Sequence, residues 1–251
     1  MDLEFVPLLG IQRDLYRLPR SMERFRAYLK TMTGNSDDDL EFPPLVAINP
    51  MAREHVPSLI DRLLELRADD IGAEAVASAR EHVSGAPGRY KVGIVVADDL
   101  RGGWTNRAAS EFGHRFAEIA LYKRGWIEAI IWSSEEPAEA AVREEVLMSV
   151  YRAGYVRRHG VAARLSEMLT QEGTVMAMAG CVEPRLDQDD LEYTRAIVEP
   201  LHDATEHSII IPCLFGDEAA AALGYRPQGL SPRAGFALAL HQARTDRVLL
   251  A

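Results

Sequence analysis

The strongest structural signal in the chain is the segment Tyr90-Lys91-Val92-Gly93-Ile94-Val95-Val96-Ala97, which is followed at once by Asp98 and Asp99. Apart from Lys91, the segment carries no charged side chain. A short and nearly continuous apolar run is typical of a strand that is buried on both faces of a parallel sheet. We therefore expect a strand over residues 90–97 with two aspartates at its carboxyl end.

Similar apolar runs predict further strands on both sides of this segment, over residues 45–48, 126–132, 174–179 and 209–214. Between them, apolar residues recur at helical spacing, which predicts helices over residues 59–66, 71–83, 105–124, 137–158, 161–171, 190–205 and 232–244. Strands that alternate with amphipathic helices are typical of an α/β fold. The expected fold is a mostly parallel sheet of five or more strands with helices on both faces, as in a three-layer sandwich.

The order of these elements also predicts the domain organisation. Residues 1–43 are expected to form an N-terminal helical extension, and residues 44–251 a single α/β domain. In the extension, apolar residues from Met22 to Met32 recur at helical spacing, Ser21 is placed to cap the helix, and Gly34 is placed to end it. Residues 35–39 are expected to form a solvated turn.

Composition narrows the class of protein. The 251 residues include 28 basic and 38 acidic side chains, so the formal net charge is −10. This balance argues against nucleic acid as a partner, because such binding relies on a basic face. No secretory signal or membrane-spanning apolar stretch is recognisable, so we expect a cytoplasmic protein without a membrane partner.

Several common catalytic motifs are absent. Only three of the 28 basic residues are lysines, and no phosphate-binding P-loop, dinucleotide fingerprint, nucleophile elbow or His-Glu-x-x-His motif occurs. A hydrolase or a transferase therefore fits the chain better than an oxidoreductase.

The segment after the strand over residues 90–97 is the main candidate site. In an α/β sheet, ligands bind where the loops leave the carboxyl ends of the strands. Glycines let backbone N–H groups approach an anion, and arginine holds a phosphate or a carboxylate through two N–H groups. The predicted site contains Asp98, Asp99, Arg101, Gly102, Gly103, Trp104, Asn106 and Arg107.

Two interpretations of this segment are open. In the functional one, Asp98 and Asp99 act as acid–base groups or cation ligands, and Arg101 with the two glycines holds a small anionic ligand. In the structural one, the segment is a tight turn capped by Thr105, and Arg107 pairs with Glu111 one helical turn later.

A second group of candidates follows the predicted strands over residues 174–179 and 209–214. Glu183 is expected to join the catalytic carboxylates, and Cys181, Cys213 and Asp217 to line the ligand site. Thiolates and carboxylates can hold a divalent metal, or one cysteine can act as a nucleophile. The alternative is that both cysteines are buried and structural, since cysteine is among the most buried residue types.

Three smaller features carry further predictions. Glu111 and His114 have a spacing that can ligate a metal, but their charged neighbours favour a solvated surface. The histidines His55 and His82 are expected on helix surfaces. The Gly/Pro-rich loop over residues 224–232 either brings Tyr225 to a ligand or merely connects two elements.

The leading interpretation is therefore an α/β enzyme, of hydrolase or transferase type, that binds a small anionic ligand at the carboxyl ends of its strands. The alternative is a non-catalytic accessory subunit or a homo-oligomer assembled through its helices. Charge is distributed unevenly: residues 181–224 carry ten acidic side chains and two arginines, a net charge of −8. This acidic segment suits a divalent cation or a basic partner.

Overall fold

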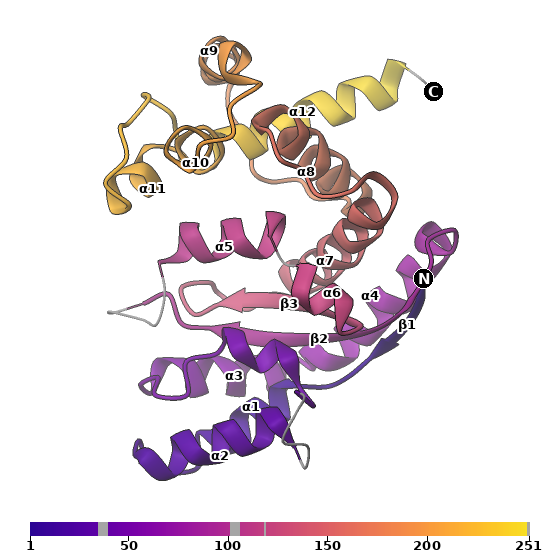
Figure 1. The fold of residues 1–251 in the computed structure, drawn as a ribbon, viewed down its shortest axis with the longest axis vertical. Helices are drawn as coiled ribbons and strands as arrows, with labels where there is room; N and C mark the ends of the chain where they lie inside the picture. Colours follow the sequence, from indigo (N-terminus) through magenta and orange to yellow (C-terminus); the bar gives the residue numbers. More distant parts are fainter. Residues whose placement is uncertain (35–39, 101–105, 118, 250–251) are drawn as a thin grey trace. The chain divides into compact units, whose positions relative to one another are not determined.

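The computed structural model describes residues 1–34, 40–100, 106–117 and 119–249 (Figure 1). The predicted turn at residues 35–39 lies outside these residues. The chain divides into two compact units: unit 1 comprises Met1–Thr105 and Ile119–Gly154, and unit 2 comprises Asn106–Glu118 and Tyr155–Ala251. The predicted boundary at residue 43, between an N-terminal extension and a single α/β domain, stays a prediction.

Unit 1 is built on a parallel sheet with the strand order β1-β2-β3. The strands are β1 (Asp2–Phe5), β2 (Arg89–Ala97) and β3 (Trp126–Trp132). β2 lies in the middle, with Leu3 of β1 opposite Tyr90 and Trp132 of β3 opposite Ala97. The central position explains why residues 92–97 are apolar and buried. β2 and β3 lie where the sequence predicts them, and β1 is a short edge strand that the prediction lacks.

The predicted sheet of five or more strands with helices on both faces is wrong, because the described residues form three strands and are otherwise mainly helical. Residues 45–47 lie in the 3₁₀ helix η1 (Pro43–Ala47), residues 174–179 in α8 (Leu165–Ala179), and residues 209–214 in α10 (His207–Phe215). Periodicity cannot distinguish a short buried strand from part of a buried helix.

Gly173 explains why α8 is divided in the sequence prediction. This glycine interrupts the helical pattern, so the prediction places a helix before it and a strand after it. In the structure the helix continues through Gly173, where a Cβ atom would lie 2.5 Å from the carbonyl oxygen of Ala239 in α12 (Ala234–Leu249). The glycine therefore permits close packing of two helices and does not end one.

The remaining helices of unit 1 surround the sheet. Ser21 caps α2 as predicted, since its side chain accepts a hydrogen bond from the N–H of Glu23. Helix α4 packs against β1 and β2, and η1 packs against β2 and β3. Helix α7 begins in unit 1 and its last residues belong to unit 2. The helices are α1 (Leu9–Leu15), α2 (Met22–Thr33), α3 (His55–Glu65), α4 (Ala68–Val83), α6 (Ile119–Lys123) and α7 (Glu139–His159).

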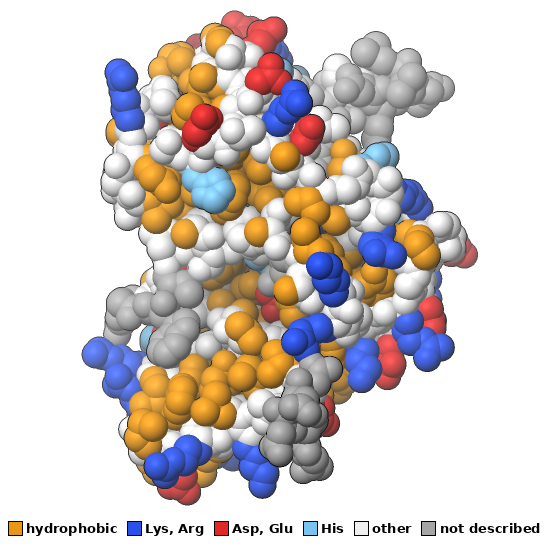
Figure 2. Space-filling model, viewed as in Figure 1, with side chains coloured by type: hydrophobic (Ala, Val, Ile, Leu, Met, Phe, Trp, Pro, Cys, Tyr) orange, Lys and Arg blue, Asp and Glu red, His pale blue; other side chains and the backbone are white. Residues whose placement is uncertain are grey.

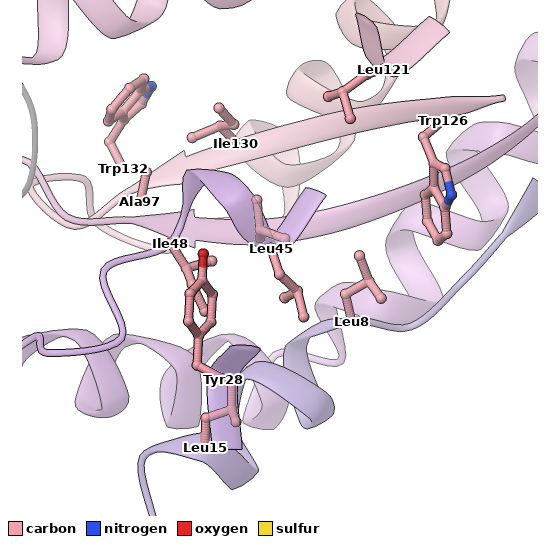
Figure 3. Close-up of a cluster of buried hydrophobic side chains, with 11 residues drawn as sticks. Leu8, Leu15, Tyr28, Leu45, Ile48, Ala97, Leu121, Trp126, Ile130 and Trp132 are labelled. Carbon is pink, nitrogen blue, oxygen red and sulfur yellow. The ribbon is translucent and has the colours of Figure 1, made fainter. Parts of the chain in front are cut away.

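The core of unit 1 combines the sheet with the N-terminal helices (Figure 3). Side chains of β2 and β3 pack against buried residues of α1, α2, η1 and α6 and of the segments next to these helices. Burial of each large apolar side chain contributes about 1.5–3 kcal/mol. The labelled residues of this cluster are Leu8, Leu15, Tyr28, Leu45, Ile48, Ala97, Leu121, Trp126, Ile130 and Trp132.

The regular secondary-structure elements among the described residues of unit 2 are all helices. Here the predicted helix over residues 105–124 is replaced by two, α5 in unit 2 and α6 in unit 1. The elements of unit 2, besides α8, α10 and α12, are α5 (Arg107–Phe116), α9 (Gln188–Val198), η2 (Glu199–Leu201) and α11 (Asp217–Ala222).

A buried ionic cluster joins α5, α8 and the start of α12. Glu111 is 3% exposed and accepts hydrogen bonds from Arg115 at 2.8 Å and Arg233 at 3.1 Å, while Arg107 lies 3.6 Å away. Arg115 also pairs with the fully buried Glu172. Burial by itself would raise the pKa of the Glu111 carboxyl, but the three arginines outweigh it and hold that pKa well below its usual value. The expectation that Glu111 lies on a solvated surface is therefore wrong.

Candidate functional site

A buried polar cluster lies at the carboxyl ends of β2 and β3 in unit 1, and Asp98 is at its centre. This aspartate follows β2 directly, and 3% of it is exposed. Its Oδ2 atom accepts a hydrogen bond from Nδ2 of Asn49 at 2.8 Å, and its Oδ1 atom lies 2.8 Å from Nε2 of His55. The Ser133 hydroxyl and the Leu100 N–H also donate to Oδ1, both at 3.3 Å. The buried carboxylate therefore has a donor at each oxygen, as burial of a charge requires.

Helix α1 holds this cluster in place. The Gln12 side chain donates to the carbonyl oxygen of Val96 at 2.8 Å and accepts from its N–H at 2.9 Å. The Tyr16 hydroxyl donates to the carbonyl oxygen of Asn49 at 2.7 Å. Burial raises the pKa of Tyr16 well above its usual value, so its hydroxyl remains a donor. The N-terminal segment thus fixes both the end of β2 and the residue that holds Asp98.

Asp99 links the ends of β2 and β3. Its Oδ1 atom accepts from the Ser133 hydroxyl and the Ser134 N–H, each at 2.9 Å, and its Oδ2 atom accepts from the Ser134 hydroxyl at 2.6 Å. Both predicted carboxylates therefore lie together at the carboxyl end of β2. These contacts are with donors of the protein, which suits both carboxylates to positioning neighbouring groups.

His55 is the residue of the cluster that faces outward in part. It is the first residue of α3, and 19% of its side chain is exposed. Since Nε2 faces Asp98, the Nδ1 atom is the ring nitrogen that remains, and it has no hydrogen-bond partner among the described residues. A carboxylate behind an imidazole orients the ring and stabilises its protonated form. The arrangement can therefore exchange a proton with a bound molecule at Nδ1.

The expectation that His55 is a helix-surface residue is wrong. The strand predicted over residues 45–48 places Asn49 at a strand end, but this segment is the 3₁₀ helix η1 and not a strand of the sheet. No local pattern shows that Asn49 and His55 both reach Asp98 at the end of β2. The signal that was present is Asn49-Pro50, which stops the preceding apolar run and starts a turn: the Asn49 side chain accepts from the N–H of Met51 at 3.0 Å.

The remaining candidates of the predicted loop have two outcomes. Arg101, Gly102, Gly103 and Trp104 lie outside the described residues, so their role stays a prediction. Thr105, the cap in the structural interpretation, also lies outside the described residues. In unit 2, Asn106 caps α5 by accepting from the N–H of Ala109 at 3.1 Å. Arg107 approaches Glu111, as the structural interpretation predicts.

The second group of candidates is not found at strand ends, because the two strands that would carry it are helices. Cys181 follows α8 and Cys213 lies within α10; both are buried and neither forms a disulfide. Burial raises the pKa of the Cys213 thiol to about 11, which disfavours the thiolate that a nucleophile or a metal ligand requires.

Glu183 and Asp217 likewise lie in unit 2. Glu183 is exposed. The Asp217 carboxylate accepts hydrogen bonds from the N–H groups of Gln228 at 2.7 Å and Gly229 at 2.8 Å. Burial would raise the pKa of Asp217, but these backbone donors and that of Leu230 lower it. Asp217 therefore fixes the loop after α11. Along the described parts of the chain, no group of three or more His, Cys, Asp or Glu residues is arranged to hold a metal ion.

Comparisons with known proteins give one similarity. No family model matches the sequence, and no solved structure matches the fold. The chain is similar to "Uncharacterized protein YjfC" of Bacillus subtilis (strain 168), with 27% identity over 103 residues, or 38% of this chain. The match covers 34% of that protein's length. In the parts of the chain that the structure describes, no helix combines the length and apolarity needed to cross a membrane.

Proposed function

We propose that unit 1 carries an acid–base catalytic site of hydrolase or transferase type, which acts on a small anionic molecule at the carboxyl ends of β2 and β3. His55 transfers the proton, and Asp98 is a positioning residue. The observation that carries this proposal is the 2.8 Å contact between Nε2 of the partly exposed His55 and Oδ1 of the buried Asp98.

The proton transfer follows from this geometry. In neutral His55 the Nε2–H group donates a hydrogen bond to the Asp98 carboxylate and keeps its proton. The Nδ1 lone pair is then left to take a proton from a water molecule or a substrate hydroxyl. The imidazolium that forms is stabilised by the adjacent carboxylate. The hydrogen bonds from Asn49 and Ser133 keep that carboxylate oriented, so that it need not reorganise during the reaction.

The residues that follow the site in the sequence support an anionic substrate. Arg101, Gly102 and Gly103 follow the site directly in the chain, and an arginine beside two glycines is suited to a phosphate or a carboxylate. A divalent cation at Asp98 would have to displace the hydrogen bonds from Asn49 and Ser133. The proposed proton transfer at His55 does not need such a cation.

Turnover of para-nitrophenyl phosphates and carboxylic esters tests the proposal. Because His55 transfers the proton, His55→Gln is expected to lower kcat/KM by about 10²–10⁴-fold. Asp98→Asn is expected to lower it to a similar extent, since the wrong tautomer is then favoured. The control is His82→Gln, which changes an exposed histidine on α4 of the same unit and should leave kcat/KM unchanged.

A binding measurement keeps the proposal testable if none of these substrates is turned over. In an NMR titration with inorganic phosphate, the ring signals of His55 are expected to shift, whereas those of His82 are not. Equal turnover in the wild type and His55→Gln contradicts the proposal. If no substrate is turned over, the proposal is contradicted when the ring signals of His55 do not shift on addition of phosphate.

Self-association of unit 1 is a second candidate function. Met22 and Leu29 lie seven residues apart on α2, and are 59% and 39% exposed. Hydrophobic side chains gather on the lower part of the face in Figure 2, where Figure 1 places α1 to α3. Light scattering is expected to show a dimer for the wild type and a monomer for Met22→Glu/Leu29→Glu. A wild-type monomer at every concentration contradicts this candidate.

A further inference from the structure

Unit 2 contains a cavity that none of the site predictions includes. Its volume is about 410 Å³, and it lies among α5, α8, the start of α10 and the loop that follows α11. Sites for small molecules usually measure about 300–1,000 Å³ and combine an apolar wall with a few polar groups. The size of this cavity is therefore that of a site for a small ligand.

The inner wall of the cavity is apolar and largely aromatic. Phe112 and Phe116 of α5, Met168 of α8 and Ile211 of α10 line it and are each less than 9% exposed. The rings of Phe112 and Phe116 have centroids 5.2 Å apart, and the His207 ring meets Phe112 edge-on with centroids 4.7 Å apart. Such a wall suits a ring, because aromatic groups attract one another in tilted and edge-to-face arrangements.

A glycine in the middle of α5 keeps the cavity open. Gly113 lines it, and a Cβ atom built there would have none of the described atoms within 4 Å, apart from α5's own backbone and the two neighbouring residues. Glycine inside a helix is less favourable than alanine by about 1 kcal/mol. At Gly173 the close approach of α12 explains the glycine, but no such approach occurs at Gly113. Packing within the described structure therefore does not require this glycine.

Three polar side chains lie at the rim of the cavity: Thr205, His207 and Tyr225. Each can donate or accept a hydrogen bond. Thr205 and His207 flank the start of α10, and the backbone of Tyr225 is tied to α11 by a 2.8 Å hydrogen bond to the carbonyl oxygen of Ala220. The rim is thus assembled from two segments that are far apart in the sequence.

The surrounding charge restricts the ligand further. Two of the three rim residues fall within residues 181–224, whose net charge is −8. Glu206, between Thr205 and His207, is exposed. The acidic character of the segment that carries Thr205 and His207 favours an uncharged or cationic molecule over an anion.

We propose that this cavity binds a small ring compound that is uncharged or positively charged and carries a hydrogen-bonding substituent. The ring packs on Phe112 and Phe116, and the substituent meets His207, Thr205 or Tyr225. This site lies wholly within unit 2 and does not depend on the proton transfer proposed for unit 1.

The test is saturation-transfer NMR of the full chain with three indole compounds of different charge: indole, tryptamine and indole-3-acetate. Indole and tryptamine are expected to bind, and indole-3-acetate about tenfold more weakly than tryptamine. Gly113→Leu fills the cavity and is expected to weaken indole binding at least about tenfold. The control is Gly10→Leu in α1, where a Cβ atom also has none of the described neighbouring atoms within 4 Å and which does not line this cavity.

A second variant serves if Gly113→Leu does not fold. Tyr225→Ala removes one side of the rim and is expected to weaken indole binding about fivefold or more. The proposal is overturned if none of the three compounds binds at millimolar concentration, or if indole binds the folded cavity variant as tightly as it binds the Gly10→Leu control. Tighter binding of indole-3-acetate than of tryptamine overturns the assignment of charge.

Discussion

Asp98 in unit 1 and Glu111 in unit 2 are both buried carboxylates, and their partners hold them in different ways. In unit 2, Glu111 faces three arginines, whose charge does not change in the physiological pH range. In unit 1, Asp98 faces an amide, a hydroxyl, a backbone N–H and His55. Only the second set contains an imidazole, which can both donate and accept a proton. The first arrangement is suited to holding helices together, and the second to chemistry.

The largest effect is expected from Glu111→Gln, because this change leaves Arg115 buried without one of its two carboxylate partners. Removal of one partner from a buried ionic cluster lowers the free energy of unfolding by about 3–5 kcal/mol. Urea denaturation measures this loss. Glu192→Gln on the exposed face of α9 is the control and should change stability by less than about 0.5 kcal/mol. A loss at Glu111 no larger than that of the control would show that the cluster does not stabilise unit 2.

The Glu111 cluster also predicts a response to acid. Because the pKa of Glu111 is lower in the folded protein than in the unfolded chain, its contribution to stability is complete above the unfolded value of about 4.3 and is lost as the pH falls further. Denaturation midpoints measured between pH 7 and pH 3 should therefore fall more steeply below pH 4.3 in the wild type than in Glu111→Gln. Parallel curves for the two proteins would contradict this assignment.

A smaller loss is expected from Asn49→Ala in unit 1. The variant removes a neutral donor from Oδ2 of Asp98, and an unsatisfied buried group costs about 1–3 kcal/mol. Urea denaturation should thus show a loss smaller than that of Glu111→Gln. If His55 acts as proposed, turnover falls as well, because the carboxylate behind the imidazole is less well oriented. A loss equal to that of Glu111→Gln would remove the distinction between the two carboxylates.

A gain in stability is expected from Asp69→Asn, also in unit 1. Burial and the adjacent Asp70 raise the pKa of Asp69 to about 6, and its Oδ1 atom is buried without a hydrogen-bond partner among the described residues. Ionising this carboxyl destabilises the folded protein as the pH rises from about 4 through 6. The variant should therefore be more stable than the wild type by about 1 kcal/mol at pH 7.5 and equally stable near pH 4. The difference at pH 7.5 is smaller than the pKa shift alone would give, because solvent screens the charge of the partly exposed Asp69. Thermal unfolding at both pH values measures this, with Asp70→Asn as the exposed control.

Elements with a strong local pattern could be predicted from the sequence. The strands over residues 90–97 and 126–132 are apolar runs bounded by polar residues, and they pair in parallel as expected. The positions of Asp98 and Asp99 at the carboxyl end of β2 follow from the first of these runs. Ser21 could be identified as a helix cap because its hydrogen bond is local.

Features that depend on contacts between distant residues could not be predicted. The apolar runs in α8 and α10 resemble buried strands because both helices are buried within unit 2. Glu111 looks solvated in the sequence because Arg233, one of its partners, lies 122 residues away. His55 and Asn49 reach Asp98 across more than 40 residues, so the contacts on which the proposed proton transfer rests are set by the tertiary fold.

The Gln12 side chain affects whether the edge of β2 can pair with a strand of another chain. β1 pairs with β2 only as far as Val92, so among the described residues the second half of β2 has no neighbouring strand on that side. At Val96, the Gln12 amide supplies both the donor and the acceptor that a strand would supply. Unpaired strand edges invite strand addition by another molecule, which leads to domain swapping or aggregation. A single side chain of α1 thus protects the central strand from this association at the position next to the candidate site.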